Sequence, residues 1–107
     1  MEQETFHTRY DEFAEQFTSL MYKHWSDILL IVNCQSPRIA SLLRFATPIS
    51  LKRMNGIWRI QVITKPAAQH SKLRHPRDNE IVAQAIRLYY HRTAELKLPR
   101  ITVEFEV

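Results

Sequence analysis

The sequence is poor in residues that several common classes of protein depend on. It has 107 residues, one cysteine and one glycine. A single cysteine excludes an internal disulfide framework and fits a reducing compartment, so we expect a cytoplasmic protein. No apolar run approaches the roughly 20 residues of a membrane span, so we expect no membrane partner. The acidic and polar start, MEQETFHTRYDEF, is unlike a signal or transit peptide.

Acidic residues are missing from the middle of the chain. Residues 38–77 contain nine lysines and arginines and no aspartate or glutamate. Residues 1–37 hold six acids and two bases, and residues 78–107 hold five acids and four bases. This asymmetry indicates an anionic partner for the central stretch, either nucleic acid or an acidic protein surface. The alternative is that folding scatters the charges over several faces.

The only glycine marks a β-hairpin over residues 48–64. Asn55-Gly56 lies between two apolar-rich runs, and a type I′ turn needs positive φ at both central residues. A two-residue turn places Met54 opposite Ile57 and, further along, Ile49 opposite Val62. Alternation then predicts two faces. The core face is expected to hold Ile49, Leu51, Trp58, Ile60 and Val62. The other face is expected to hold Ser50, Lys52, Arg59 and Gln61.

The residues before the hairpin predict helices. Apolar residues recur at steps of three and four over residues 6–32, which indicates a long amphipathic helix with a break near Thr18-Ser19. Its first part, residues 1–20, is expected to project from the domain or to pair with another chain. Ser36-Pro37 predicts the start of a further helix, because serine caps and proline suits the first helical position. Thr47-Pro48 is expected to end it.

The residues after the hairpin predict a helix and a last strand. One or two helical turns are expected over residues 67–73, followed by a mobile basic loop over residues 70–77. Asp78 or Asn79 is expected to cap the next helix. Its buried side is expected to hold Ile81, Val82, Ala85, Ile86, Leu88 and Tyr89. Residues 101–107 alternate as a strand, with Ile101, Val103, Phe105 and Val107 facing inward.

These elements predict one α+β domain over residues 1–107. The order is one or two helices, a helix, two strands, a helix and a strand. Helices would cover one face of a three-stranded sheet in a two-layer arrangement and leave the face with Lys52 and Arg59 open. If the last strand joins the hairpin, its acids offer those two bases cross-strand partners, which is a structural alternative to binding.

The sequence does not favour an enzyme, a metal site or a cofactor. Cys34 ends an apolar run and is expected to be a buried structural thiol. His70 and His75 lack a third ligand at metal-binding spacing. Asp78 and Glu80 suit the start of a helix better than an acid–base pair. No P-loop, GxSxG or HExxH motif occurs.

Four segments resemble the C-terminal domain of the tau subunit of bacterial DNA polymerase III. They are Trp25 with Asp27-Ile28-Leu29, SPRIASLLRFATPISL, RDNEIVAQAI and ITVEF. Family features would be Trp25, the Leu42/Leu43–Ala46–Pro48 approach to the hairpin, and Asn79-Glu80, over about residues 21–105. The resemblance implies a truncated KH-like topology and a module that tethers the polymerase by binding its catalytic subunit. A helicase-loading family with a KH-like domain is similar, which implies a helicase as the alternative partner.

The sequence departs from that family in two ways. Nothing in it resembles the ATPase portion that precedes this domain in tau. With one glycine there is no GxxG loop, so the phosphate grip of KH domains has no support.

Three binding hypotheses follow. Single-stranded DNA or RNA would contact Lys52, Arg53, Arg59, Lys65, Lys72, Arg74 and Arg77. A protein tether would use an exposed apolar patch, at Met54 and Ile57 of the hairpin or at Phe6, Tyr10 and Phe13 of the first helix. A homodimeric adaptor would use the aromatic stripe from Phe6 to Trp25.

Overall fold

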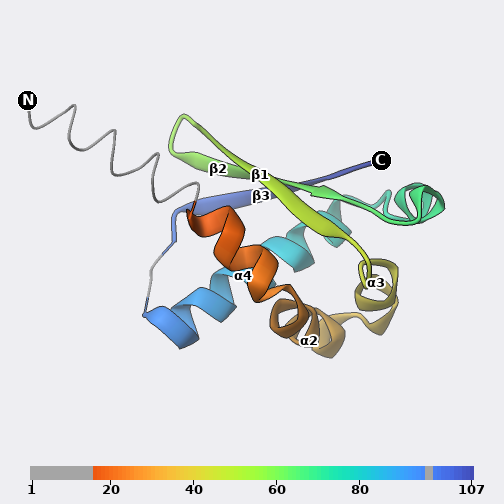
Figure 1. Cartoon of the computed structure of the whole chain (residues 1–107), viewed down its shortest axis with the longest axis horizontal. Coiled ribbons are helices and arrows are strands. Elements are labelled where there is room, and N and C mark those ends of the chain that lie inside the picture. Colours follow the sequence, from red (N-terminus) through yellow and green to blue (C-terminus); the bar gives the residue numbers. More distant parts are fainter. Residues whose placement is uncertain (1–15, 96–97) are drawn as a thin grey trace, which may run out of the picture.

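Helices and strands separate into two layers (Figure 1). The structure is a computed structural model that describes residues 16–95 and 98–107. It begins with the described part of an N-terminal helix, residues 16–23. The elements that follow are α2 (Trp25–Gln35), α3 (Pro37–Leu42), β1 (Thr47–Met54), β2 (Ile57–Ile63), the 3₁₀ helix η1 (Ala67–Lys72), α4 (Pro76–Ala94) and β3 (Arg100–Glu106).

The three strands form a mixed sheet in the order β1-β2-β3. β1 and β2 are antiparallel, whereas β3 runs parallel to β2. A parallel neighbour needs a crossover, which α4 supplies between β2 and β3. Figure 1 shows α2, α3 and α4 on the same side of the sheet. The expectation of a two-layer α+β domain with helices on one face is confirmed.

The hairpin turn forms at Asn55-Gly56. Both residues have positive φ, 52° and 75°, as a type I′ turn requires. The predicted register is confirmed from Met54 opposite Ile57 to Ser50 opposite Gln61. The prediction for Ile49 is wrong, because a bulge places Pro48 opposite Val62. The bulge turns Ile49 out of the core, and its side chain is 41% exposed.

The N-terminal helix is interrupted at His24 rather than at Thr18-Ser19. Residues 1–15 lie outside the described part of the chain. Residues 16–20 do not project as expected, because Phe17 is buried and its ring lies 5.4 Å from the ring of Trp58 and 4.9 Å from that of Tyr90. This helix therefore packs against both the hairpin and α4.

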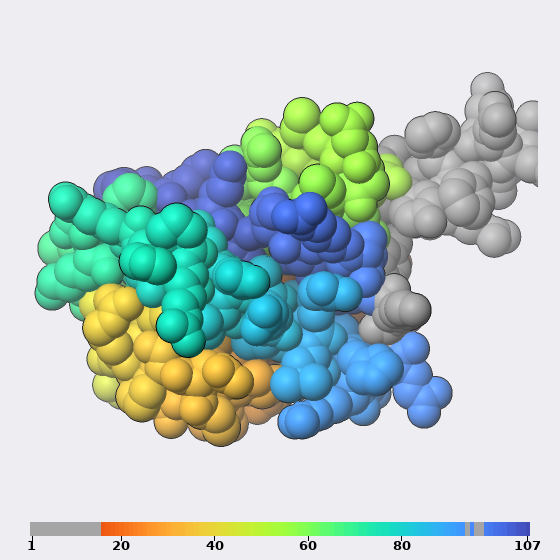
Figure 2. Space-filling view, turned by 180° about the vertical axis from the view of Figure 1, so that it is seen from behind, coloured from red at the N-terminus to blue at the C-terminus, as the bar shows by residue number. Residues whose placement is uncertain are grey.

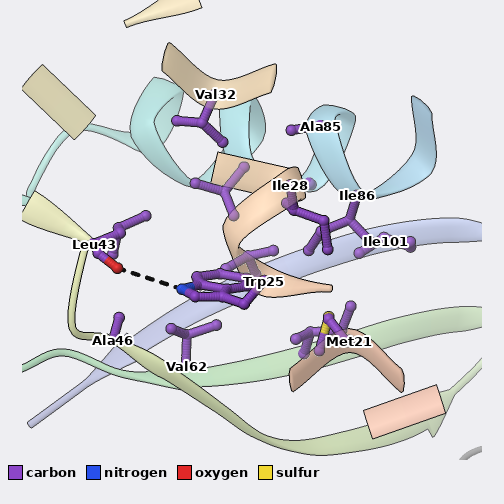
Figure 3. Packing of buried hydrophobic residues seen from close by; sticks show 14 of the residues in the cluster. Met21, Trp25, Ile28, Val32, Leu43, Ala46, Val62, Ala85, Ile86 and Ile101 are labelled. Carbon is purple, nitrogen blue, oxygen red and sulfur yellow. Dashed lines mark hydrogen bonds between the residues drawn. The ribbon is translucent and has the colours of Figure 1, made fainter. Parts of the chain in front are cut away.

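Trp25 lies at the centre of the core. Its indole nitrogen Nε1 donates a buried hydrogen bond of 3.3 Å to the carbonyl oxygen of Leu43. Figure 3 shows the indole nitrogen directed at this carbonyl, with Ala46 and Val62 on the same side of the ring. The side chain thus joins α2, the turn between α3 and β1, and the central strand.

The segment predicted as a mobile loop is packed structure. η1 already includes His70, whose Nε2 lies 2.9 Å from the carbonyl oxygen of Phe105. Leu73 is buried in the core. α4 begins at Pro76, not after Asp78 or Asn79, because the ring nitrogen of His75 accepts the N–H of Arg77 and caps the helix.

The side of α4 that faces the core was predicted only in part. Val82, Ala85 and Ile86 are buried as expected, but Leu88 is 37% exposed and Tyr90 is buried instead. Among the described residues, none hydrogen-bonds to the Tyr90 hydroxyl. Burial, and to a lesser extent the neighbouring Tyr89, raises the pKa of this phenol above its ordinary range.

The last strand is close to its prediction. Ile101, Val103 and Phe105 face the core as expected, whereas Val107 is 72% exposed because β3 ends at Glu106. Asn79 fixes the start of α4 to this strand, since its Nδ2 donates a 2.6 Å hydrogen bond to the carbonyl oxygen of Val103.

Replacing Trp25 with phenylalanine should destabilise the domain. The Trp25→Phe variant loses packing volume and leaves the buried Leu43 carbonyl without its donor, at an expected cost of about 2 kcal/mol in the free energy of unfolding. Urea denaturation followed by circular dichroism measures this. The control is Tyr22→Phe, because Tyr22 is 63% exposed and should change little. A cost below about 0.5 kcal/mol would contradict the central role of Trp25.

Replacing Tyr90 with phenylalanine should not lower the free energy of unfolding, in contrast to the replacement of Trp25. The variant removes a buried hydroxyl that has no partner, so we expect an unchanged or higher stability, by up to about 1 kcal/mol. Because burial disfavours the phenolate and so raises the pKa of Tyr90, the folded state loses stability as the pH rises above about 10, where the tyrosine of the unfolded chain ionises. Alkaline unfolding should therefore be shallower in Tyr90→Phe than in wild type. A clear loss of stability at pH 7 would show that the hydroxyl has a partner.

Candidate functional site

The open face of the sheet carries both signs of charge. Lys52 and Arg59 lie opposite each other in the hairpin, as the register predicted. Arg59 also forms an ion pair with Glu104 of β3, with 3.4 Å between Nε and Oε1. Gln61 bridges Ser50 and Glu106 by hydrogen bonds. A uniformly positive open face is therefore wrong, and the alternative of cross-strand pairing is confirmed for Arg59.

The predicted basic residues divide into separate groups. Arg53 pairs across the hairpin with Trp58 and is only half exposed, on the side of the sheet opposite to Lys52 and Arg59. Lys65 follows β2, and the remaining three lie beyond it along the chain. Figure 1 shows the turn of the hairpin at one end of the molecule and α3 and η1 at the other.

Five exposed cations lie at the far end of the molecule. We call this surface the basic end. Its members are exposed and come from the turn before β1, the residue after β2, and the connection from η1 into α4. They are Arg44, Phe45, Lys65, Lys72, Arg74 and Arg77. Within residues 16–95 and 98–107, no ion pair is formed by any of these five cations. Figure 2 shows the atoms of residues 65–77 as a continuous rim at one side of the molecule.

The segments of the basic end are held together by Arg38 of α3. One guanidinium nitrogen donates to the carbonyl oxygen of Lys72 at 3.1 Å, and the other forms an ion pair with Asp78 at 3.0 Å. The Asp78 side chain is only 6% exposed, while that of Arg38 is 56% exposed. Arg38 therefore compensates the one nearby buried carboxylate, and that carboxylate does not neutralise the basic end.

The hairpin pairing brings Phe45 to the same end. β1 begins at Thr47 opposite Ile63, so the residues just before β1 lie beside those just after β2. Leu43 and Ala46 are buried, whereas Phe45 between them is 63% exposed. The guanidinium carbon of Arg44 lies 5.4 Å from the centre of the Phe45 ring. An exposed aromatic ring and five cations thus share one surface.

Two further features complete the positive field. α4 is a 19-residue helix whose N-terminus opens at Pro76, and the dipole of a helix places partial positive charge at that end. The ring nitrogen of His75 caps the N–H of Arg77, and the acid of the first turn, Asp78, is paired with Arg38. Chemically, this arrangement suits the binding of anions.

The residues predicted for a protein contact are described only in part. Met54 is 54% exposed at the tip of the hairpin, and Ile57 opposite it is half-buried. Phe6, Tyr10 and Phe13 lie outside the described residues. Cys34, expected to be buried, is exposed on α2, because the buried face of that helix runs through Trp25, Ile28 and Val32.

Residues 16–95 and 98–107 contain neither a cluster suited to a metal ion nor a helix suited to span a membrane. In that part of the chain, no three histidine, cysteine, aspartate or glutamate side chains come close enough to hold a metal ion. The same residues include no helix with both the length and the apolar character of a membrane span.

The residues on which the expected resemblance to tau is based have structural roles here. Trp25 donates to Leu43, Ala46 and Pro48 are buried, and Asn79 fixes α4 to β3. Comparison of the chain with protein-family models, with curated proteins and with solved structures finds no match. The resemblance therefore rests on the sequence motifs alone.

Sequence reasoning missed Arg44, Phe45 and Arg38 as parts of this surface. The acid-free stretch included both arginines, but nothing local showed that Arg38 pairs with Asp78, forty positions away. Phe45 breaks the apolar pattern of α3, since Ile39, Leu42, Leu43 and Ala46 form its buried side. An aromatic residue outside the pattern was the available signal.

Proposed function

We propose that this chain is a non-enzymatic binding module that holds single-stranded nucleic acid on the basic end. The observation that carries the proposal is exposed Phe45 beside Arg44, at the end of the molecule where Lys65, Lys72, Arg74 and Arg77 are also exposed and form no ion pair with the described residues. Proteins that bind single strands combine cations that track the backbone with aromatic rings on which bases stack. The single cysteine, which allows no disulfide within the sequence given, supports a cytoplasmic location.

The open sheet face is a weaker candidate for the same ligand. Its Arg59 is already paired with Glu104, and Glu106 lies on the same face beside Gln61. Phosphates approaching this face would meet two carboxylates, and like charges in contact are unfavourable. The basic end has no exposed acid between residues 38 and 77.

Charge reversal at the basic end should abolish binding to a single strand. The variant Lys72→Glu/Arg74→Glu/Arg77→Glu should weaken binding of fluorescein-labelled oligothymidylate of 12 nucleotides at least tenfold, measured by fluorescence anisotropy. The matched control is Lys52→Glu/Arg59→Glu on the open face, which should change affinity less than threefold. For wild type, four phosphate contacts predict a slope of about −3 for log affinity against log salt. Flat, weak binding at low salt would overturn the proposal.

Phe45 distinguishes nucleic acid from an acidic protein. Phe45→Ala should weaken oligothymidylate binding about tenfold, because base stacking is lost, and should leave the salt slope unchanged. Binding of polyglutamate, which has no bases, should not respond to this variant. An equal loss for both ligands would indicate an acidic protein surface as the partner.

A second candidate is the protein tether that the resemblance to tau implies. The observation that favours it is Met54, which exposes 54% of a large apolar side chain at the hairpin tip. Methionine is common at adaptable binding surfaces.

If the tether uses the hairpin, Met54→Asp should weaken binding to the purified catalytic subunit of DNA polymerase III. We expect at least a tenfold loss by surface plasmon resonance, because apolar anchors dominate interface energies. Tyr22→Asp is the control, since Tyr22 is equally exposed on a different element. Absence of binding by wild type, with the helicase tested in parallel, would contradict the tether.

A further inference from the structure

A groove runs between α4 and the outer edge of β3. It encloses about 380 Å³, a volume within the range of ordinary ligand sites. One stripe of α4 lines it from Pro76 to Arg87, and β3 lines it from Arg100 to Val103. Figure 2 shows α4 and β3 next to each other on this face of the molecule. The groove belongs to neither the basic end nor the open sheet face.

The β3 side of the groove is a strand edge. β3 has β2 as its one neighbour in the sheet. The carbonyl of Glu106 accepts from the N–H of Thr64, which continues β2, so even-numbered residues of β3 direct their backbone groups toward β2. The backbone groups of Ile101, Val103 and Phe105 therefore point away from the sheet.

Side chains already cover two of the outward carbonyls. Asn79 donates to the carbonyl oxygen of Val103, and His70 lies 2.9 Å from that of Phe105. Of the described residues, none hydrogen-bonds to the backbone N–H or carbonyl of Ile101 or to the N–H of Val103. These backbone groups of Ile101 and Val103, which could pair with another strand, lie together inside the groove.

Two arginines lie at one end of the groove, near these backbone groups of β3. Asn79 contacts Val103, so the helix and the strand are in register there. Eight residues along α4 from Asn79 reach Arg87 after about 12 Å. Three residues back along β3 from Val103 reach Arg100 after about 10 Å. Both guanidiniums are exposed and, in the described part of the chain, form no ion pair.

We propose that this groove binds an extended peptide of a partner protein, which adds a short strand to β3 and places an acidic side chain between Arg87 and Arg100. Main-chain hydrogen bonds to Ile101 and Val103 would supply part of the affinity, as in other cases of strand addition. The two arginines at one end of the groove would select for acid there, although Glu80 also lines the groove, and the free backbone groups at Ile101 and Val103 limit the added strand to about three residues.

The experiment titrates isotope-labelled full-length chain with a synthetic octapeptide of alternating valine and glutamate, followed by NMR chemical shifts. Resonances of residues 79–87 and 100–103 should shift. A peptide of alternating valine and lysine should bind at least tenfold more weakly, because both arginines would repel it. An alternating valine–glutamate peptide with an N-methyl group on every residue should also lose at least tenfold, since it retains the charge but lacks the N–H groups that would pair with β3.

Two double variants of the protein test the same contact, one in the groove and one at the basic end. Arg87→Ala/Arg100→Ala should weaken binding of the glutamate peptide about tenfold, the effect of two partly exposed ion pairs. Arg74→Ala/Arg77→Ala, at the basic end, should leave it unchanged. Equal effects of the two double variants, or shifts confined to residues 65–77, would mean that the peptide binds by charge at the basic end and would overturn the proposal.

Two other occupants would also overturn it. Sedimentation of the free chain as a dimer whose formation requires Arg100 would indicate that a second copy covers the edge. If Asp11→Asn/Glu12→Gln/Glu15→Gln shifts the resonances of residues 100–103 in the free chain, the chain's own N-terminal segment is the occupant.

Discussion

The hydrogen bond from Trp25 to Leu43 is the constraint on which the other features depend. An indole N–H buried without an acceptor costs a large fraction of the stability of a small domain, so the carbonyl of Leu43 must stay where the indole reaches it. Leu43 and Ala46 are then fixed inside the core, and the two residues between them must face outward. The exposed position of Phe45 is a consequence of how the inside is packed.

Local sequence predicted the elements whose causes are local. Asn55-Gly56 specified the turn and most of the hairpin register, Ser36-Pro37 specified the start of α3, and alternation specified the buried face of β3. The bulge at Pro48 was not predictable, because it depends on how the start of β1 meets the core rather than on the turn. Strand order and the parallel pairing of β3 also depend on long-range packing.

The candidate site was less predictable than the fold, because charges act on partners that are distant in sequence. Nine bases without an acid between residues 38 and 77 indicated an anion-binding surface. In the folded chain, Arg38 pairs with Asp78 and Arg59 pairs with Glu104. These carboxylates follow their arginines in the sequence by forty and forty-five positions. What stays unpaired is a smaller surface at the other end of the hairpin. A count of charges predicted its existence but not its place.

The side chains of Asn79 and His70 have a consequence for the behaviour of the molecule in concentrated solution. Open strand edges tend to recruit other chains and to grow into fibres. By occupying the carbonyls of Val103 and Phe105, these two side chains shorten the recruiting stretch of β3 to little more than one residue pair. That is too short to nucleate a sheet between identical molecules. Replacing Asn79 or His70 should therefore first increase aggregation in concentrated solution, before it affects the helices.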